Sequence, residues 1–420
     1  MSRSQKLTLL TALYLAQGVP FGFLSLALPA MLREGGFSLK TISALSLLGL
    51  PWALKFLWAP YLDHRASPRT WLLLLQSASI AAALVLSQLN MEGQLVLLLV
   101  AAFVFSLLTA TQDVVTDGLA VRMLDDRERG LANGIQVGAY RVGMILGGGA
   151  LLWLFAKTNW TVMFLAMAAL LAVTMIPVLW LRDTPARSHV ATSNTRLLTA
   201  WLRRLSSPGM LGFIGLIFCY RYGDQLITSQ FTPFLVDYGL TKEAIALMKG
   251  TVGSVTSLAG ALLGGWLAYA IGRRTLLLSS GVAQVASFML YILVALGDGG
   301  DIALLWTATI LEGVINTMAQ VALFTLMMDA ADPEHAGTDF TLMASAMVLI
   351  GGVGTFTGGA IADAFGYPPA FVTGALLALA GCVFVVWSLD RQHAHAGRIA
   401  EVWHVAARSD SAAAQRSVGS

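Results

Sequence analysis

Apolar stretches of about 20 residues recur along the whole chain, and they set the first limit on how it can fold. Inside a bilayer the backbone polar groups are satisfied only in a helix or a closed barrel, and stretches of this length match a membrane-spanning helix. We therefore predict an all-α polytopic membrane protein with twelve transmembrane helices. The predicted spans are 7–32, 41–61, 71–89, 94–120, 131–155, 160–181, 209–236, 244–270, 275–296, 303–328, 339–362 and 369–389.

The composition agrees with this class and argues against several others. Of 420 residues, 57% are hydrophobic and 12% are charged, whereas a soluble domain has roughly 25% charged residues. Cys219 and Cys382 both lie in apolar runs, which predicts neither a disulfide nor a thiolate metal site. The sequence shows no metal cluster, nucleophile elbow, phosphate loop or basic–aromatic patch. We therefore expect no enzyme, no bound metal or cofactor, and no nucleic-acid partner.

Polar segments divide the chain into two similar halves. The connection 182–208 separates six spans from six, which predicts bundles at 1–181 and 209–389, and we expect the polar tail 390–420 to be disordered. Three short matches in order, at nearly constant spacing, indicate a duplicated six-span unit, and transporters built this way bind substrate near the membrane midplane. The matches pair "LREGGFSLKTI" (32–42) with "LVDYGLTKEAI" (235–245), "RTWLLL" (69–74) with "RTLLLS" (274–279), and "GMILGGG" (143–149) with "IGGVGTF" (350–356).

Basic residues predict the orientation in the membrane. Loops on the side of the two termini hold 18 of the 26 Lys and Arg residues, and the opposite loops hold four: Arg33, Lys40, Lys157 and Lys242. Because basic residues concentrate in cytoplasmic loops, both termini and the central connection are expected in the cytoplasm. The first apolar run continues to about Leu32 without a clear cleavage site, so we interpret it as a span and not a cleaved signal.

Ionisable residues inside the spans are the candidate functional groups, since such residues normally face the bundle interior or water. They are Lys55, Asp113, Asp117, Arg141, Arg221, Asp224, Lys249 and Glu312. All six histidines fall in loops or the tail, so proton coupling would have to use carboxylates. The proton-coupling candidates are Asp113, Asp117, Asp224 and Glu312.

In the first half, Asp113 and Asp117 stand four residues apart in "ATQDVVTDGLAVR" and share one helical face. Arg141 in the fifth span has a similar depth to Asp113, so we predict that these two lie close enough to pair. A purely structural ion pair that holds the hairpin together is an equal alternative to a functional one. Lys55 is nearer the cytoplasm and could extend its ammonium group to the membrane surface.

In the second half, Arg221 and Asp224 stand three residues apart near the middle of a span and can pair within the helix or reach neighbouring helices. Glu312 lies about midway along its span, whereas Lys249 is near an outer end and could reach the surface. A shift of 203 residues places Asn316 opposite Asp113 and Gln320 opposite Asp117, which suits a proton site in one half and hydrogen bonds to substrate in the other. The substrate-binding candidates are Arg141, Arg221, Tyr140, Gln17, Asn316, Gln320 and Lys55.

Glycine and proline positions predict close helix packing and interrupted helices. Glycines spaced four apart let helix backbones approach each other, and prolines bend or break a span. The glycine pairs are Gly18/Gly22, Gly143/Gly147, Gly260/Gly264 and Gly354/Gly358, and the prolines are Pro20, Pro29 and Pro51.

Two loops resemble the loop signature of the major facilitator superfamily. "GGWLAYAIGRR" (264–274) follows the eighth span, and "YLDHRASPR" (61–69) is a degenerate first-half version that lacks the usual glycine. The resemblance implies the major facilitator fold, with two pseudo-symmetric six-helix bundles, and a role for the loop residues in conformational change. These residues are Asp63, Arg65, Arg69, Gly272, Arg273 and Arg274.

A closer resemblance is to the AmpG-like permeases, and it is strongest in the first half. The segments that resemble them are "YLAQGVPFGF" (14–23), "LLGLPWALKFLWAPYLD" (47–63), "TQDVVTDGLAVRML" (111–124) and "ERGLANGIQVGAYRVGMILGGG" (128–149). This group includes muropeptide permeases of the bacterial inner membrane and RhtX/FptX-type siderophore permeases. The compact chain, "TDGLAVR" and "GTDFT" look more like the siderophore branch.

The resemblance implies a proton-driven importer in the bacterial inner membrane. We expect ferric siderophore uptake, with import of anhydro-muropeptides as the alternative and drug export as a further one, since "GAYRVGMILGGG" is similar to a glycine motif of exporters. A membrane sensor is disfavoured because the tail is short and polar. The expected partners are a small-molecule substrate and the lipid bilayer, the driving force is a proton gradient, and we expect a functional monomer.

Overall fold

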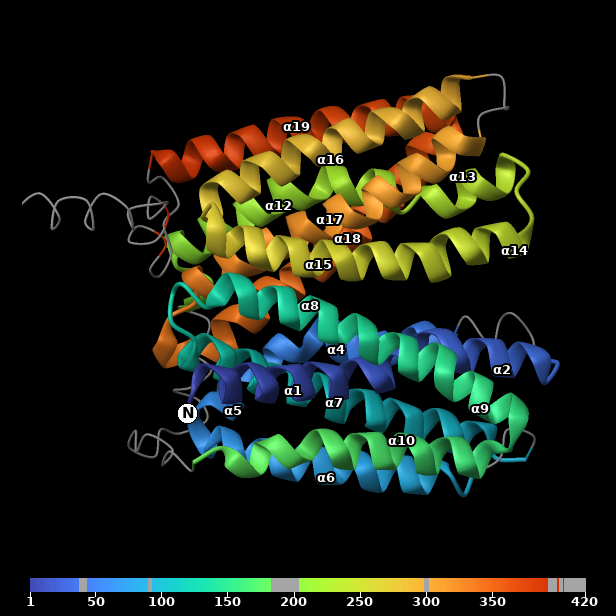
Figure 1. The fold of residues 1–420 in the computed structure, drawn as a ribbon, viewed down its shortest axis with the longest axis vertical. Coiled ribbons are helices and arrows are strands. Elements are labelled where there is room, and N and C mark those ends of the chain that lie inside the picture. The colour runs from blue at the N-terminus through green and yellow to red at the C-terminus, as the bar shows by residue number, and fades with distance from the viewer. Residues whose placement is uncertain are drawn as a thin grey trace, which may run out of the picture. The chain divides into compact units, whose positions relative to one another are not determined.

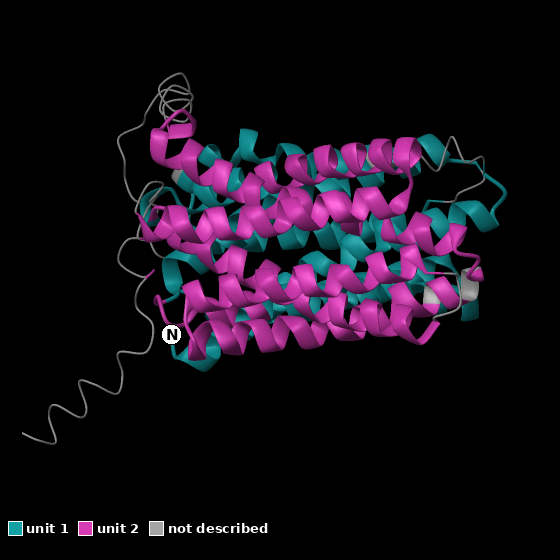
Figure 2. Cartoon of the chain, turned by 90° about the horizontal axis from the view of Figure 1, so that it is seen from above, with its two compact units in different colours: residues 1–124, 135–202, 333–345 teal, residues 125–134, 203–332, 346–420 magenta. Residues whose placement is uncertain are grey.

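The computed structural model describes residues 1–37, 44–89, 93–182, 204–297 and 302–391, together with Ile399 and Trp403. The regular structure of these described residues is helical, as expected (Figure 1). The chain divides into two compact units, coloured separately in Figure 2. Unit 1 comprises Met1–Leu124, Ile135–Leu202 and Pro333–Ser345, and unit 2 comprises Asp125–Gly134, Arg203–Asp332 and Ala346–Ser420. Each unit therefore includes a short segment from the other half of the sequence.

Unit 1 is built around long helices that pack side by side. Helix α6 packs against α7 and α10, and α1 packs against α7 and α10 (Figure 1). The long helices are α1 (Arg3–Gly22), α6 (Pro68–Leu86), α7 (Leu95–Met123), α8 (Arg129–Ile145) and α10 (Trp160–Met175). The shorter elements are η1 (Phe23–Ala27), α2 (Leu28–Glu34), η2 (Ala44–Gly49), α4 (Leu50–Leu54), η3 (Lys55–Leu57), α5 (Ala59–Arg65), η4 (Leu146–Ala150), α9 (Leu151–Lys157) and η5 (Ile176–Trp180).

Unit 2 repeats this kind of packing, with α19 against α12 and α16, and α17 against α15 and α16. Its long helices are α12 (Pro208–Thr228), α15 (Gly253–Ala270), α16 (Arg273–Leu296), α17 (Ile302–Ala330), α18 (Ala336–Phe365) and α19 (Tyr367–Asp390). The shorter elements are α13 (Phe231–Asp237), α14 (Lys242–Ile245), η6 (Ala246–Val252) and η7 (Pro333–His335). The first residues of α18 belong to unit 1, and the first residues of α8 belong to unit 2.

Local signals in the sequence explain where the helices begin. Ser67 and Ser207 cap α6 and α12 by accepting hydrogen bonds from backbone N–H groups, and each is followed by a proline, which suits the first helical position. Gly272 precedes α16 with φ of 81°. Because this left-handed conformation favours glycine, Gly272 of the loop signature is explained by the turn it makes.

Ten described helices are long and apolar enough to cross a membrane by length and composition, compared with the twelve spans predicted. The predicted second span falls on a series of short elements, where Leu47–Leu57 is a shorter apolar helix and Pro51 begins α4. The predicted seventh span falls on α12 and α13, and α12 is not among the ten. Arg221 and Asp224 in α12 make that helix less apolar.

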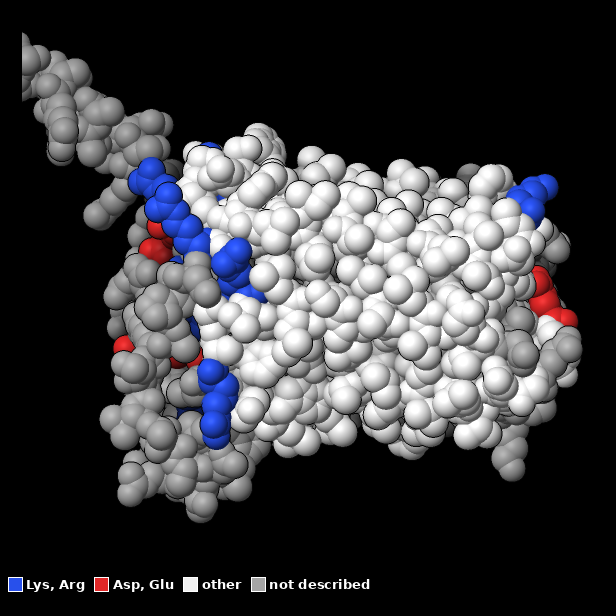
Figure 3. Space-filling view, turned by 90° about the horizontal axis from the view of Figure 1, so that it is seen from below, with Lys and Arg blue, Asp and Glu red and all other residues white. Residues whose placement is uncertain are grey.

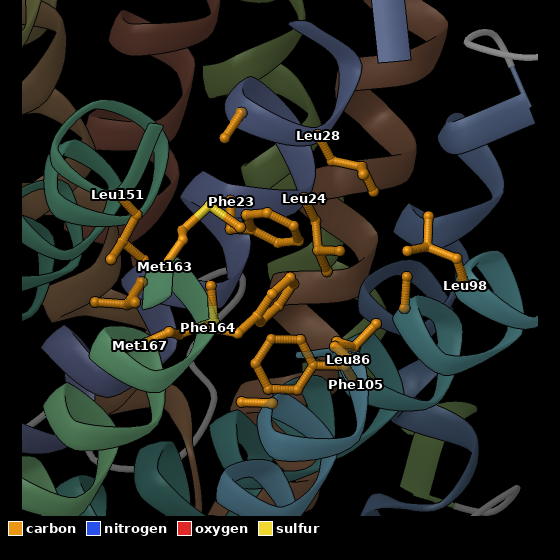
Figure 4. Close-up of a cluster of buried hydrophobic side chains, with 14 of the residues drawn as sticks. Phe23, Leu24, Leu28, Leu86, Leu98, Phe105, Leu151, Met163, Phe164 and Met167 are labelled. Atoms are coloured by element: carbon orange, nitrogen blue, oxygen red, sulfur yellow. The ribbon is translucent and has the colours of Figure 1, made fainter. Parts of the chain in front are cut away.

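Apolar clusters hold the helices of unit 1 together. Figure 4 shows one of them, in which Phe23, Phe105 and Phe164 pack from three different helical elements together with Met163 and Met167. In the view of Figure 3, the Lys, Arg, Asp and Glu side chains of the described residues gather at the two ends, and the broad surface between them is free of these residues. An uncharged surface on which many large hydrophobic side chains are exposed fits lipid contact. Together with the ten long apolar helices, it makes this a multi-pass membrane protein.

Most of the predicted linker and tail lies outside the described residues, and so do the expectations that fall on 183–203 and on most of 390–420. Ile399 and Trp403 are described in the tail, and both are buried. The Trp403 indole Nε1 donates a hydrogen bond of 2.9 Å to Asp390 at the end of α19. The expected bundle limits, 1–181 and 209–389, stay a prediction.

Candidate substrate and proton-coupling sites

The predicted acids of α7 lie in a buried polar cluster of unit 1. Asp113 forms an ion pair with Lys55, and both side chains are almost completely buried. This cation comes from the broken second span. Arg141, the partner that we predicted for Asp113, is half-buried on α8, and its pairing with Asp113 stays a prediction. Lys55 accordingly does not extend to the surface, because its charge is neutralised inside the bundle.

Asp117 lies one turn further along α7 and has different partners. It accepts a hydrogen bond of 2.9 Å from the Tyr14 hydroxyl of α1 and one of 3.3 Å from the Gln136 amide of α8. Both donors are neutral, and the carboxylate of Asp117 interacts electrostatically with that of Asp113. Only 2% of Asp117 is exposed, and it forms no direct ion pair among the described residues, although the Lys55 charge also acts on it.

Helices α1 and α8, which carry Tyr14 and Gln136, approach each other closely. A side-chain carbon at Gly18 would overlap the backbone of Tyr140 and Gly143, and one at Gly147 would overlap the backbone of Val19. The predicted glycine pairs of the first half therefore lie at a real helix contact, where the missing side chains allow backbone-to-backbone packing.

In unit 2 the two predicted acids are each ion-paired. Asp224 forms an ion pair of 2.6 Å with Arg221 on the same helix, one of the two arrangements that we predicted. It also accepts a hydrogen bond of 2.5 Å from the Gln284 amide of α16. Glu312 lies 3.4 Å from Lys249, and both side chains of this ion pair are half-buried. Asn316 donates to Glu312 at 3.1 Å.

Asn316 also links the two ion pairs of unit 2, because Arg221 Nη1 lies 3.5 Å from its carbonyl oxygen. The structure thus brings together five of the predicted residues in one cluster: Arg221, Asp224, Lys249, Glu312 and Asn316. Gln320 is half-buried one turn beyond Asn316 on α17. In unit 1, Gln17 is completely buried, and its amide has no hydrogen-bond partner among the described residues.

The first-half loop signature contacts the start of α18 inside unit 1. Asp63 accepts a bond of 3.1 Å from Arg122 and bonds of 2.7 Å from both the backbone N–H and the hydroxyl of Thr338. Because an acid at a helix start satisfies free N–H groups, Asp63 fixes the first turn of α18 to α5. Arg65 lies over the Tyr61 ring at 5.2 Å, and Arg69 is half-buried.

The second-half signature makes a denser network in unit 2. Arg273 and Arg129 both bind the completely buried Asp329, at 2.6 and 2.8 Å. Arg274 binds Asp390 through two parallel bonds of 2.8 Å. Sequence reasoning missed Asp329, although it stands 203 residues after Asp126, at the spacing that relates the two halves.

The comparisons with known proteins agree with this architecture. A family model described as Major Facilitator Superfamily matches residues 10–355 and 250–413. This chain belongs to that superfamily. A major facilitator transporter, FucP, solved in the outward conformation, has a similar fold, with a TM-score of 0.71 over 91% of this chain and 98% of that one, at 16% identity.

Two curated relatives extend this major facilitator assignment. The anhydromuropeptide permease of Escherichia coli is 31% identical over 353 residues, which cover 82% of this chain and 72% of the relative. An uncharacterized protein of Haemophilus influenzae is 28% identical over 387 residues, covering 88% of this chain and 91% of the relative. The resemblance to AmpG-like permeases is thereby confirmed, and the chain is a transporter by family.

Proposed function

We propose that this major facilitator protein imports anhydromuropeptides into the cytoplasm, driven by a proton gradient. The choice of substrate is supported by the E. coli relative, whose name states that it is an anhydromuropeptide permease. The comparisons therefore favour the muropeptide alternative, and they give no support to the siderophore that the sequence motifs suggested. We place the protein in the bacterial inner membrane, where such a substrate would enter from outside, and propose that it acts as a monomer.

The chemistry of the polar clusters fits this substrate. A muropeptide has sugar hydroxyl and amide groups together with peptide carboxylates, so it needs cations and hydrogen-bonding side chains for recognition. Arg141 in unit 1, and Arg221 with Asn316 in unit 2, offer such groups. Arg221 is held by Asp224 and Asn316, which would orient its guanidinium group for a carboxylate.

The single observation that supports proton coupling is the environment of Asp117. Of the four predicted proton-coupling acids, Asp113, Asp224 and Glu312 have ion pairs, whereas Asp117 is buried with a tyrosine and a glutamine as its hydrogen-bond partners. A buried carboxylate next to a second carboxylate gains from binding one proton, which removes the like-charge repulsion.

Transport would follow if the two states of the protein hold this proton differently. An ion or proton shifts a conformational equilibrium only by its difference in affinity for the two states. Opening of the polar cluster to either side of the membrane would change the water access of Asp117, and the gradient would then favour release of the proton on the cytoplasmic side.

Uptake into proteoliposomes tests the proposal. Purified protein should concentrate a radiolabelled anhydromuropeptide when the outside is more acidic, and collapse of the gradient with a protonophore should abolish accumulation. A ferric siderophore serves as the competing substrate in parallel vesicles. Accumulation of the siderophore alone would refute the proposed substrate, and muropeptide accumulation that is insensitive to the pH gradient would refute proton coupling.

A further inference from the structure

Three aromatic rings from three separate elements meet in unit 1, and together they form what we call the aromatic corner: Phe21 of α1, Trp52 of α4 and Tyr140 of α8. The ring centres of Phe21 and Trp52 lie 5.5 Å apart, those of Phe21 and Tyr140 lie 5.6 Å apart, and those of Trp52 and Tyr140 lie 6.3 Å apart. The first and last pairs meet edge to face. Each ring thus fixes the orientation of the other two.

The backbone explains why these rings meet. Gly18 and Gly143 allow α1 and α8 to touch, and Phe21 stands one turn after Gly18 while Tyr140 stands one turn before Gly143. Trp52 is placed by α4, a short helix that begins at Leu50 with Pro51 in its first turn. The aromatic corner is therefore built on a backbone-to-backbone helix contact, which suits a site that must keep its geometry.

The corner differs from a packing cluster in two ways. Its three side chains are all partly exposed, whereas Phe23, Phe105 and Phe164 of the apolar cluster in Figure 4 are completely enclosed. In addition, the Tyr140 hydroxyl and the Trp52 indole N–H have no hydrogen-bond partner among the described residues. Elsewhere in the unit, Tyr14 and Trp58 use the same groups to bond Asp117 and Thr111.

Free polar groups at the edge of partly exposed rings are suited to a ring-shaped ligand that is itself amphipathic. A pyranose presents C–H groups on its faces, which pack on an aromatic ring, and hydroxyl or amide groups around its rim, which accept from N–H and O–H donors. Lys55 lies 5.6 Å from the centre of the Trp52 ring, and its ion pair with Asp113 balances its charge. The corner therefore suits the uncharged rim of a sugar.

We propose that the aromatic corner binds the sugar part of the transported molecule, with Trp52 as the stacking platform and Tyr140 as a donor to the sugar rim. This inference rests on the proposed function and adds to it which part of the substrate unit 1 recognises. The proposal also separates recognition of the sugar from recognition of the peptide, because residues outside this corner would bind the peptide part of the substrate.

The test measures the affinity of purified protein in lipid nanodiscs for three compounds: an anhydro-disaccharide peptide, the same anhydro-disaccharide without peptide, and the free peptide. The variants are Trp52→Ala, Trp52→Phe and Tyr140→Phe. The matched control is Trp153→Ala, which removes a side chain that is 63% exposed on α9 of the same unit. Thermal unfolding and elution as a single species confirm that each variant is folded.

The expected result is that Trp52→Ala weakens binding of both sugar-containing compounds by about tenfold or more, and leaves binding of the free peptide at the wild-type level. Trp52→Phe should keep part of the affinity because a ring remains, and Tyr140→Phe should lose the contribution of one hydrogen bond. Trp153→Ala should bind all three compounds like the wild type.

The failures of the two proposals can be told apart. Wild-type protein that binds neither sugar-containing compound would overturn the proposed substrate and the corner together. Two results would overturn the role of the aromatic corner alone, provided that the wild-type protein binds the glycopeptide. In the first, Trp52→Ala binds the glycopeptide as well as the wild type does. In the second, Trp52→Ala loses affinity for the sugar-containing compounds and for the free peptide to the same extent. Should Trp52→Ala fail to fold, Trp52→Phe and Tyr140→Phe decide by the same comparison.

Discussion

Asp117 differs from the three other predicted proton-coupling acids because both of its hydrogen-bond donors, Tyr14 and Gln136, are neutral. In Asp117→Asn the amide imitates a permanently protonated acid. We therefore expect this variant to lose accumulation driven by a pH gradient but to retain exchange of labelled for unlabelled substrate across the membrane. Proteoliposome assays in both modes make the comparison.

The control for this experiment is Asp363→Asn, which makes the same substitution at an exposed position of α18. It should accumulate substrate like the wild type. Gradient-driven accumulation by Asp117→Asn at the wild-type level would show that the proton is held elsewhere.

The ion pair of Lys55 and Asp113 leads to a prediction about stability. Removing one partner leaves the other charge buried and unbalanced, which costs about 3–5 kcal/mol, whereas removing both leaves no charge behind. Lys55→Met and Asp113→Leu should each lower the unfolding temperature strongly, and the double variant should recover much of the loss. Thermal unfolding in detergent measures all three. Additive effects of the two substitutions would contradict a direct pair.

Some of the charged residues and ion pairs could be predicted from the sequence, and others could not. The charged residues of the spans were identifiable because charges in apolar runs are rare, and Arg221 with Asp224 was predictable since both lie on one helix. The partner of Asp113 was not, because depth in the membrane does not say which of several neighbouring spans faces an acid. Asp329 was missed because it lies near a span end, where charges are ordinary.

Among the helical elements, two glycines of η4 differ in how closely they contact α1. A side-chain carbon at Gly147 would overlap the Val19 backbone, whereas one at Gly149 would meet open space within 4 Å. Gly147→Val should therefore push α1 away and destabilise the protein by more than the 1–3 kcal/mol or so that is typical of overpacking. Gly149→Val should unfold at the wild-type temperature. Equal stability of the two variants would mean that this helix contact is not needed for the fold.

The broken second span shows why some elements escape prediction. Its apolar run indicated one continuous helix at 41–61, and Pro51 indicated an interruption, but the sequence did not reveal that the chain changes helix type several times before Arg65. Those changes turn Trp52 and Lys55 toward α1 and α7. The role that we propose for Trp52 therefore depends on the irregularity of this span, which the apolar periodicity of the sequence does not reveal.

For the whole molecule, the uneven distribution of Lys and Arg predicts the orientation. In a variant without Cys219 and Cys382, a cysteine placed at exposed Lys157 should react with a membrane-impermeant maleimide in spheroplasts. A cysteine at exposed Arg127 should react only after the membrane is permeabilised. Labelling in the reverse order would place both termini outside and would exclude import in the proposed direction.

The contact of Asp63 with Thr338 affects how the protein is made. Synthesis and membrane insertion proceed from the N-terminus, yet unit 1 includes Pro333–Ser345, which leave the ribosome only after most of unit 2. Unit 1 is therefore incomplete in the membrane until the start of α18 has been synthesised. The two units must complete their folding together, late in translation, and a chain that stops before residue 333 gives an unfinished first unit as well as a truncated second one.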